Sequence, residues 1–170
     1  MQEAFVRTAM LLGEDAMEVL AQKHVAVFGL GGVGSFCAEA LARAGVGALT
    51  LVDDDTVAES NLNRQLVALR STLGRPKAEV MAARIQEINP QCRLRVLAKR
   101  YTPETREEFF DQTLHYLADC IDSVGCKVDL IATAMERGIP ILSAMGTGNK
   151  LDPGKLTFTD LAKTSVCPLA

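Results

Sequence analysis

A short apolar run that breaks into four glycines most constrains the fold of this 170-residue chain. Residues 25–28 are followed by G-L-G-G-V-G, in which Gly29, Gly31, Gly32 and Gly34 precede an alanine-rich helical pattern. In a strand–loop–helix unit such glycines let the backbone turn tightly and approach a phosphate, while the helix offers unpaired N–H groups. The alternative is that they serve only tight packing of the helix against the strand. The context favours a nucleotide-phosphate site.

A second apolar run, residues 48–52, ends at Asp53, nineteen residues after Gly34. A nucleotide-binding unit of this type carries an acidic residue at about this distance, where its carboxylate binds a ribose hydroxyl. We therefore predict that Asp53 binds ribose, although an ordinary acidic turn is the alternative. The adjacent Asp54 and Asp55 are interpreted as solvated or structural residues.

Apolar runs alternate with helical patterns along the first 144 residues. This alternation predicts an α/β fold: a Rossmann-like, doubly wound, mainly parallel sheet with helices on both faces. A further strand is conceivable over residues 156–159. The expected strands cover residues 24–28, 48–52, 93–98, 116–121 and 139–144, and the expected helices cover residues 33–44, 77–88, 104–111 and 124–137.

The length and composition fit one domain with a well-buried core, since 48% of the residues are hydrophobic and 23% are charged. We expect residues 1–170 to form a single nucleotide-binding domain that is truncated at its C-terminus. A net charge of −3 argues against nucleic-acid binding by bulk electrostatics. A local basic patch remains open, because four basic residues lie close in sequence: Arg64, Arg70, Arg75 and Lys77.

The cysteines are odd in number and form no C-x-x-C motif, which supports neither a disulfide framework nor a zinc site. The sequence shows no signal peptide and no apolar run long enough to span a bilayer. We expect a soluble cytoplasmic protein without a membrane partner. Cys37, in the first predicted crossover helix, is interpreted as a core residue.

Charged residues that follow the predicted strands suggest what the nucleotide does. Arg64, in Ser-Asn-Leu-Asn-Arg-Gln, is placed to bind a triphosphate and to stabilise charge that builds on phosphorus. Lys77 begins a helix, where a cation opposes the dipole, so either a phosphate or a neighbouring acid is expected beside it. Asp122, at a predicted strand end, is a magnesium candidate or a helix cap. Asp119 is interpreted as a buried structural acid.

Together, the motifs G-L-G-G-V-G, V-D-D-D, S-N-L-N-R-Q, G-R-P-K-A and C-I-D-S resemble the adenylating family that includes ubiquitin-activating enzymes and bacterial activators for thiamin and molybdopterin synthesis. The resemblance covers nearly the whole chain. It implies ATP- and Mg²⁺-dependent adenylation of a carboxylate. The implied roles are phosphate approach for Gly31, ribose binding for Asp53, triphosphate binding for Asn61, Arg64 and Gln65, phosphate binding for Lys77 and metal binding for Asp122.

The N-terminal segment, Phe5-Val-Arg7 with Leu11-Leu12-Gly13, resembles the family segment whose arginine enters the active site of the partner subunit. This resemblance implies a homodimer with Arg7 as a catalytic residue. An ordinary amphipathic N-terminal helix is the alternative.

Residues 143–153 and 160–165 resemble the dehydratases of the family that act on threonylcarbamoyl-adenosine in tRNA. This implies a modified tRNA as substrate, with its carboxylate activated by adenylation and then closed into a ring. The nucleophile is then intramolecular, so no catalytic role is expected for Cys167. Whether the Gly146 loop binds a monovalent cation stays open.

Two other functions are weighed against this interpretation. One is an adenylyltransferase that activates the C-terminus of a ubiquitin-like sulfur-carrier protein. The other is an NAD-binding oxidoreductase or redox sensor, which leaves Arg64 and Lys77 unexplained.

Overall fold

The computed structural model describes residues 3–148, 150–165, 167 and 169. At its centre is a five-stranded parallel sheet in the order β3-β2-β1-β4-β5. This arrangement confirms the predicted fold class, although the last three strands are shorter than expected and residues 156–159 form no strand. The strands are β1 His24–Phe28, β2 Ala48–Val52, β3 Arg93–Leu97, β4 Tyr116–Asp119 and β5 Ile141–Ser143.

Five α-helices and six short 3₁₀ helices occupy the described part of the chain. The α-helices are α1 Val6–Leu12, α2 Glu14–Ala21, α3 Gly34–Ala44, α4 Lys77–Ile88 and α5 Val124–Glu136. The 3₁₀ helices are Glu3–Phe5, Glu59–Asn61, Arg70–Thr72, Arg106–Phe109, Pro153–Lys155 and Leu161–Lys163.

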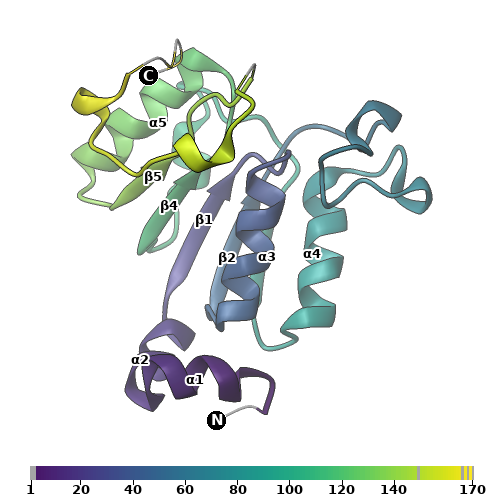
Figure 1. Cartoon of the computed structure of the whole chain (residues 1–170), viewed down its shortest axis with the longest axis vertical. Coiled ribbons are helices and arrows are strands. Elements are labelled where there is room, and N and C mark those ends of the chain that lie inside the picture. The colour runs from purple at the N-terminus through teal and green to yellow at the C-terminus, as the bar shows by residue number, and fades with distance from the viewer. Residues whose placement is uncertain (1–2, 149, 166, 168, 170) are drawn as a thin grey trace.

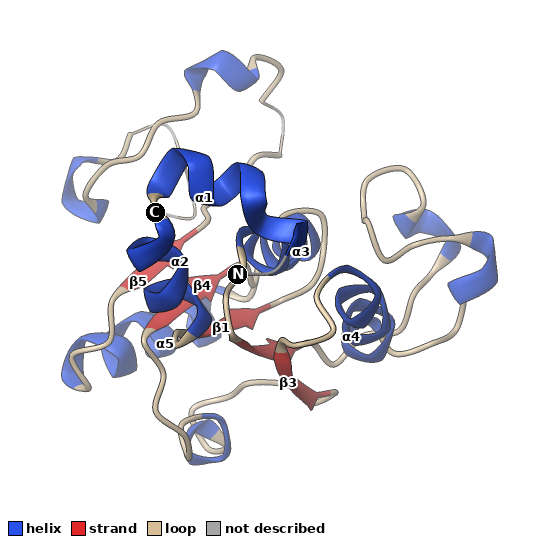
Figure 2. Cartoon of the chain, turned by 90° about the horizontal axis from the view of Figure 1, so that it is seen from below, coloured by secondary structure: helices blue, strands red, loops and turns tan. Residues whose placement is uncertain are grey.

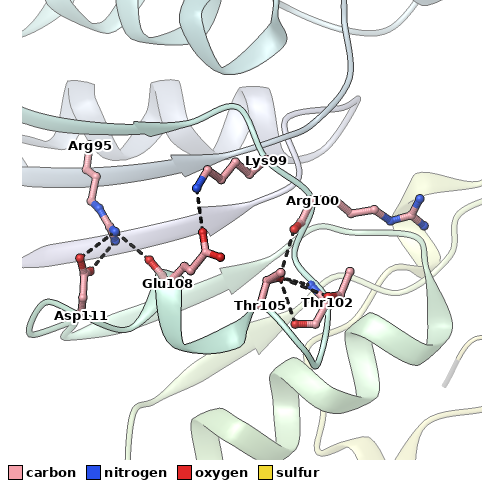
Figure 3. Close-up of polar contacts among 7 residues, drawn as sticks. All are labelled: Arg95, Lys99, Arg100, Thr102, Thr105, Glu108 and Asp111. Carbon is pink, nitrogen blue, oxygen red and sulfur yellow. Dashed lines mark hydrogen bonds and ion pairs between the residues drawn. The ribbon is translucent and has the colours of Figure 1, made fainter.

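The helix expected over residues 104–111 was wrong, because only the 3₁₀ helix Arg106–Phe109 forms there. The Thr105 hydroxyl accepts a hydrogen bond from the backbone N–H of Thr102 at 3.2 Å (Figure 3). Such local side-chain bonds compete with helical hydrogen bonding. Phe109 is fully buried and anchors this short turn in the core.

Helices cover both faces of the sheet (Figures 1 and 2). α3 and α4 lie on one face, where residues such as Ala38, Met81 and Ile85 pack against Leu49 and Leu51. α5 lies on the other face, where the core includes Phe28, Tyr101, Phe109, Leu117 and Leu130. Because both faces are covered, β1 and β2 are buried along their whole lengths, as their continuous apolar sequences predict.

The direction of winding reverses between β1 and β4, which are neighbours in the sheet but far apart in sequence. In open parallel sheets, ligands bind outside the carboxyl ends of the strands at such a reversal. The glycine loop leaves β1 at this point, whereas α1 and α2 lie at the opposite end of the strands, near the start of β1 (Figure 1). Within the described residues, no helix is both long enough and apolar enough to cross a membrane.

Candidate nucleotide-binding site

Two of the four loop glycines are required by the packing of the fold itself. Gly29 has a φ of +84°, and a β-carbon on it would lie 2.8 Å from the carbonyl oxygen of Cys120. A β-carbon on Gly34 would lie only 1.7 Å from the carbonyl oxygen of Gly29. The packing interpretation of the motif therefore applies to these two positions, where α3 approaches β1 and the end of β4.

Gly31 and Gly32 have no such packing reason. The atom nearest to a β-carbon on Gly31 would be Nε2 of Gln65 at 3.7 Å, and the nearest atom for Gly32 would be Cγ of Arg64 at 3.6 Å. Both distances are ordinary van der Waals contacts, and neither glycine has a positive φ. Packing therefore does not require glycine at these two positions, which lie beside Arg64 and Gln65.

Ser35, which the sequence analysis did not single out, fixes this arrangement. Its hydroxyl donates to the carbonyl oxygen of Gly31 at 2.6 Å and accepts from the backbone N–H of Leu66 at 3.3 Å. The residue is fully buried. Ser35 therefore joins the glycine loop to the segment that carries Arg64 and Gln65. In the sequence, the signal for this role was a small hydroxyl residue directly after the last glycine of the loop.

Asp53 extends from the end of β2 toward the glycine loop. Its Oδ2 accepts from the backbone N–H of Leu30 at 2.6 Å, and its Oδ1 accepts from that of Asp55 at 2.9 Å. Burial raises the pKa of this carboxyl group, although these two hydrogen bonds oppose the shift. A carboxylate oxygen accepts more than one hydrogen bond, so Asp53 keeps acceptor capacity for a hydroxyl.

Lys77 is brought to the acidic turn by a short antiparallel bridge between Thr56 and Pro76. The backbone N–H of Lys77 donates to the carbonyl oxygen of Asp55 at 3.0 Å, and Nζ lies 2.7 Å from Oδ2 of Asp55. The Lys77 side chain is only 5% exposed, whereas that of Asp55 is 67% exposed. The Asp55 carboxylate thus neutralises the charge of Lys77 and stays accessible to solvent.

Arg64 is exposed and donates from Nη1 to the carbonyl oxygen of Ser60 at 3.0 Å and to Oδ1 of Asn63 at 2.9 Å. Both acceptors are neutral, so no carboxylate offsets the guanidinium charge among the described residues. Gln65 is 9% exposed, and its Oε1 is buried without a hydrogen-bond partner in the described part of the chain. Buried polar atoms of this kind ordinarily have a partner, so Oε1 of Gln65 keeps capacity to accept a hydrogen bond.

Asn61 lies in the same segment but serves the fold of its own loop. Its Oδ1 accepts from the backbone N–H of Ala58 at 3.0 Å and so caps the 3₁₀ helix Glu59–Asn61. The residue is buried. Asn61 thereby shapes the segment that carries Arg64 and Gln65.

Asp122 is exposed in the turn between β4 and α5, beside the winding reversal. Its carboxylate makes no hydrogen bond or ion pair with any other described residue, and hard oxygen ligands of this kind suit Mg²⁺. The carboxylates of Asp53, Asp54 and Asp55 also lie close together, within 4.8 Å of one another. Asp53 and Asp55 are already engaged, which makes Asp122 the better candidate ligand.

Arg7, which the family resemblance implies is catalytic, is not brought to this site within its own chain. Arg7 is an exposed residue of α1, and α1 lies at the opposite end of the strands from the glycine loop (Figure 1). The Cys167 thiol donates to the carbonyl oxygen of Gly146 at 3.8 Å, within the segment that follows β5.

The basic residues of the predicted patch separate in the structure. Lys77 is buried, Arg70 lies 3.6 Å from the Glu59 carboxylate, and Arg64 and Arg75 are exposed. At the β3 edge, acids offset the basic side chains, with Arg95 2.8 Å from Asp111 and Lys99 2.7 Å from Glu108 (Figure 3). Of these basic groups, Arg64 and Arg75 alone form no ion pair with an acidic side chain among the described residues.

Cys37 is half-buried on α3 and packs against the core, as the sequence analysis expected. Interaction with the thiol of Cys120, the residue that follows β4, lowers the pKa of Cys37 to about 7. The same pairing raises the pKa of Cys120.

Comparison with known proteins identifies the family. The chain is 47% identical over 170 residues to the tRNA threonylcarbamoyladenosine dehydratase of Bacillus subtilis and 47% identical over 169 residues to that of Escherichia coli. These matches cover 100% and 99% of this chain but only 67% and 63% of the two relatives. The crystal structure of the E. coli dehydratase, TcdA, in complex with ATP superimposes with a TM-score of 0.96 at 47% identity, and the match covers 98% of this chain and 69% of that chain. A profile of the ThiF family matches residues 5–167, and the chain therefore belongs to the ThiF family.

Proposed function

We propose that residues 1–170 form the adenylation domain of a dehydratase that cyclises threonylcarbamoyl-adenosine in tRNA. The observation that carries this proposal is the pair Gly31 and Gly32, where packing does not require glycine, beside Arg64 and Nε2 of Gln65. The ATP complex of the 47% identical relative supports ATP as the occupant of this site.

In the proposed site the nucleotide lies across the carboxyl ends of β1 and β2. Asp53 accepts a hydrogen bond from a ribose hydroxyl, and the glycine loop with the first amides of α3 binds phosphate oxygens. Arg64 and Gln65 contact the triphosphate, and Asn61 holds their segment in place. Lys77 supplies a further positive charge, since a phosphate that approaches it competes with the exposed Asp55.

The reaction proceeds in two displacements. A carboxylate oxygen of the threonylcarbamoyl group attacks the α-phosphorus of ATP, the bond to the β-phosphate breaks, and pyrophosphate leaves. A nucleophile within the threonylcarbamoyl group then attacks the activated carboxyl carbon, and AMP leaves as the ring closes. Arg64 stabilises the charge that builds on the phosphoryl oxygens, while the fixed loop holds the reacting atoms in line.

Asp122 is the residue that would hold Mg²⁺, which when bound would neutralise phosphate charge. Its exposed carboxylate, unengaged among the described residues, fits this task. We expect Asp122→Ala to abolish the Mg²⁺-dependent part of ATP affinity. A calorimetric titration with and without Mg²⁺ measures this change, and an undiminished Mg²⁺ effect would remove Asp122 from the site.

A homodimer belongs to this proposal, in which Arg7 acts on a second copy, because α1 lies at the opposite end of the strands from its own glycine loop (Figure 1). Arg7→Ala and Arg64→Ala variants should each be inactive alone. An equal mixture should recover about a quarter of the activity, since half of the dimers are mixed and have one intact site. A mixture as inactive as its components would show that Arg7 does not act across an interface.

Pyrophosphate exchange separates the proposed function from its rivals. With ATP and labelled pyrophosphate, exchange should require tRNA that carries threonylcarbamoyl-adenosine, and unmodified tRNA serves as the control. Exchange that requires a sulfur-carrier protein instead would favour the adenylyltransferase. Calorimetric binding of NAD without any response to ATP would favour the oxidoreductase. The proposal also places the protein in the cytoplasm. It further includes a monovalent cation at the Gly146 loop, and titration with K⁺ tests that cation site.

A further inference from the structure

A buried ion pair lies beneath the proposed metal-binding turn. Asp119, the last residue of β4, and Lys127, on the first turn of α5, have side chains that are 0% and 2% exposed. Their Oδ2 and Nζ atoms lie 2.8 Å apart. The sequence analysis expected Asp119 to be a buried structural acid but did not consider Lys127.

The pair joins the ends of two neighbouring strands. Besides the Asp119 carboxylate, Nζ of Lys127 donates to Oγ of Ser143 at 3.2 Å and to the carbonyl oxygen of Ala144 at 3.1 Å. The Ser143 hydroxyl donates to Oδ2 of Asp119. Oδ1 of Asp119 accepts from the backbone N–H of Ile121 at 3.2 Å. One network thus holds the turn after β4 and the start of the segment after β5.

The energetics of buried charges indicate that this network does more than stabilise the fold. The free energy needed to remove two charges from water offsets much of their mutual attraction. Apolar side chains of similar size therefore often stabilise a core equally well. Apolar side chains, however, form no directional hydrogen bonds. All three ammonium protons of Lys127 have defined acceptors, and these acceptors fix the backbone at two strand ends.

We propose that Lys127 and Asp119 are positioning residues that hold Asp122 and the segment beginning at Ala144 in one fixed relative arrangement. Asp119 fixes the turn through Ile121, next to Asp122, and Lys127 fixes the carbonyl of Ala144. The inference rests on the proposed function, since the importance of that arrangement comes from Asp122 as the Mg²⁺ ligand.

Paired variants separate positioning from stability. Lys127→Met leaves the Asp119 carboxylate buried and unpaired, so its thermal midpoint should fall. In the double variant Asp119→Leu/Lys127→Met the charge conflict is absent, and the midpoint should return toward that of the parent. Ser143→Ala keeps the ion pair and removes only one hydroxyl. It therefore replaces the double variant in the test if the double variant does not fold. Ile85→Val, which destabilises the core next to α4, is the matched control for lost stability.

Hydrogen exchange gives a readout that needs no nucleotide. In the double variant, amides of residues 120–123 and 144–148 should exchange at least tenfold faster than in the parent, while β1 and β2 keep their protection. Ser143→Ala should accelerate the same amides severalfold at an unchanged thermal midpoint. Ile85→Val should leave them as in the parent. Parental exchange in a folded double variant, or in Ser143→Ala if the double variant does not fold, would overturn the proposal.

Calorimetry then tests the link to the metal. The Mg²⁺-dependent gain in ATP affinity should fall at least tenfold in the double variant and stay unchanged in Ile85→Val. An undiminished gain would show that the network does not position Asp122. If the parent chain itself binds no ATP, the proposed function fails, and the exchange measurement alone decides whether Lys127 and Asp119 order the two segments.

Discussion

Replacing Gly31 with alanine adds a methyl group that the protein can accommodate. The same methyl group would occupy space that the proposed phosphate needs. The new β-carbon would be 3.7 Å from Nε2 of Gln65, an ordinary contact, and Gly31 has no positive φ. A glycine-to-alanine change at a compatible backbone position typically stabilises by about 0.4–1 kcal/mol, because the unfolded chain loses freedom. We therefore expect a free energy of unfolding equal to or slightly above that of the parent.

ATP affinity should change in the opposite direction. The methyl group would hold the phosphate away from the loop amides, and a hydrogen bond to a charged group contributes about 1.5–3 kcal/mol. Loss of one such bond corresponds to a decrease in affinity of roughly tenfold to a hundredfold. Calorimetric titration with ATP and Mg²⁺ measures the affinity, and urea unfolding measures the stability of the same sample.

Gly34→Ala is the matched comparison, because its β-carbon would lie 1.7 Å from the carbonyl oxygen of Gly29. That overlap forces a backbone shift, so this variant should lose about 1–3 kcal/mol of stability or more. If Gly31→Ala binds ATP as tightly as the parent at unchanged stability, the inference of a phosphate at this loop is refuted.

Arg64→Ala should lower turnover roughly a hundredfold, as loss of a transition-state charge partner does, without changing the thermal midpoint, because the side chain is exposed; unchanged kinetics would contradict its role. Burial raises the pKa of Asp53 above 3.8, so its contribution to unfolding free energy should decrease as the pH rises through the raised value, while ATP affinity increases. Urea unfolding of the parent and Asp53→Ala at several pH values isolates this contribution, and a pH-independent difference would exclude it. Alkylation of Cys37, followed by mass spectrometry, should rise with pH through about 7, while Cys92, whose pKa burial raises to about 11, stays unmodified. Cys120→Ala should shift the Cys37 midpoint to higher pH, and an unshifted midpoint would show that the two thiols are not coupled.

The sequence predicted best what is decided locally. The glycine loop and Asp53 each follow a continuous apolar strand, so their place at the carboxyl ends of β1 and β2 could be anticipated from pattern and spacing alone. The helix expected near Thr105 failed because a side-chain hydrogen bond competes with the backbone there, which an apolar pattern does not record.

Tertiary contacts set the remaining features of the site. Lys127 appears in the sequence as an ordinary helical lysine, and only the packing of α5 against β4 and β5 buries it beside Asp119. Likewise, Gly29 and Gly34 are indistinguishable from Gly31 and Gly32 within the motif. Their different tasks emerge only from the distances to Cys120, Gln65 and Arg64.

The bridge between Thr56 and Pro76 makes the intervening segment a module with its own closed base. Backbone hydrogen bonds from Val57 to Arg75 at 2.9 Å and from Gly74 to Val57 at 2.8 Å complete that base. Doubling the length of a flexible loop adds only about 0.6 kcal/mol of closure entropy. Variation in length between these endpoints would therefore leave the Asp55–Lys77 pair in register. Because the same segment carries Arg64 and Gln65, its closed base holds these side chains and the Asp55–Lys77 pair on one common frame.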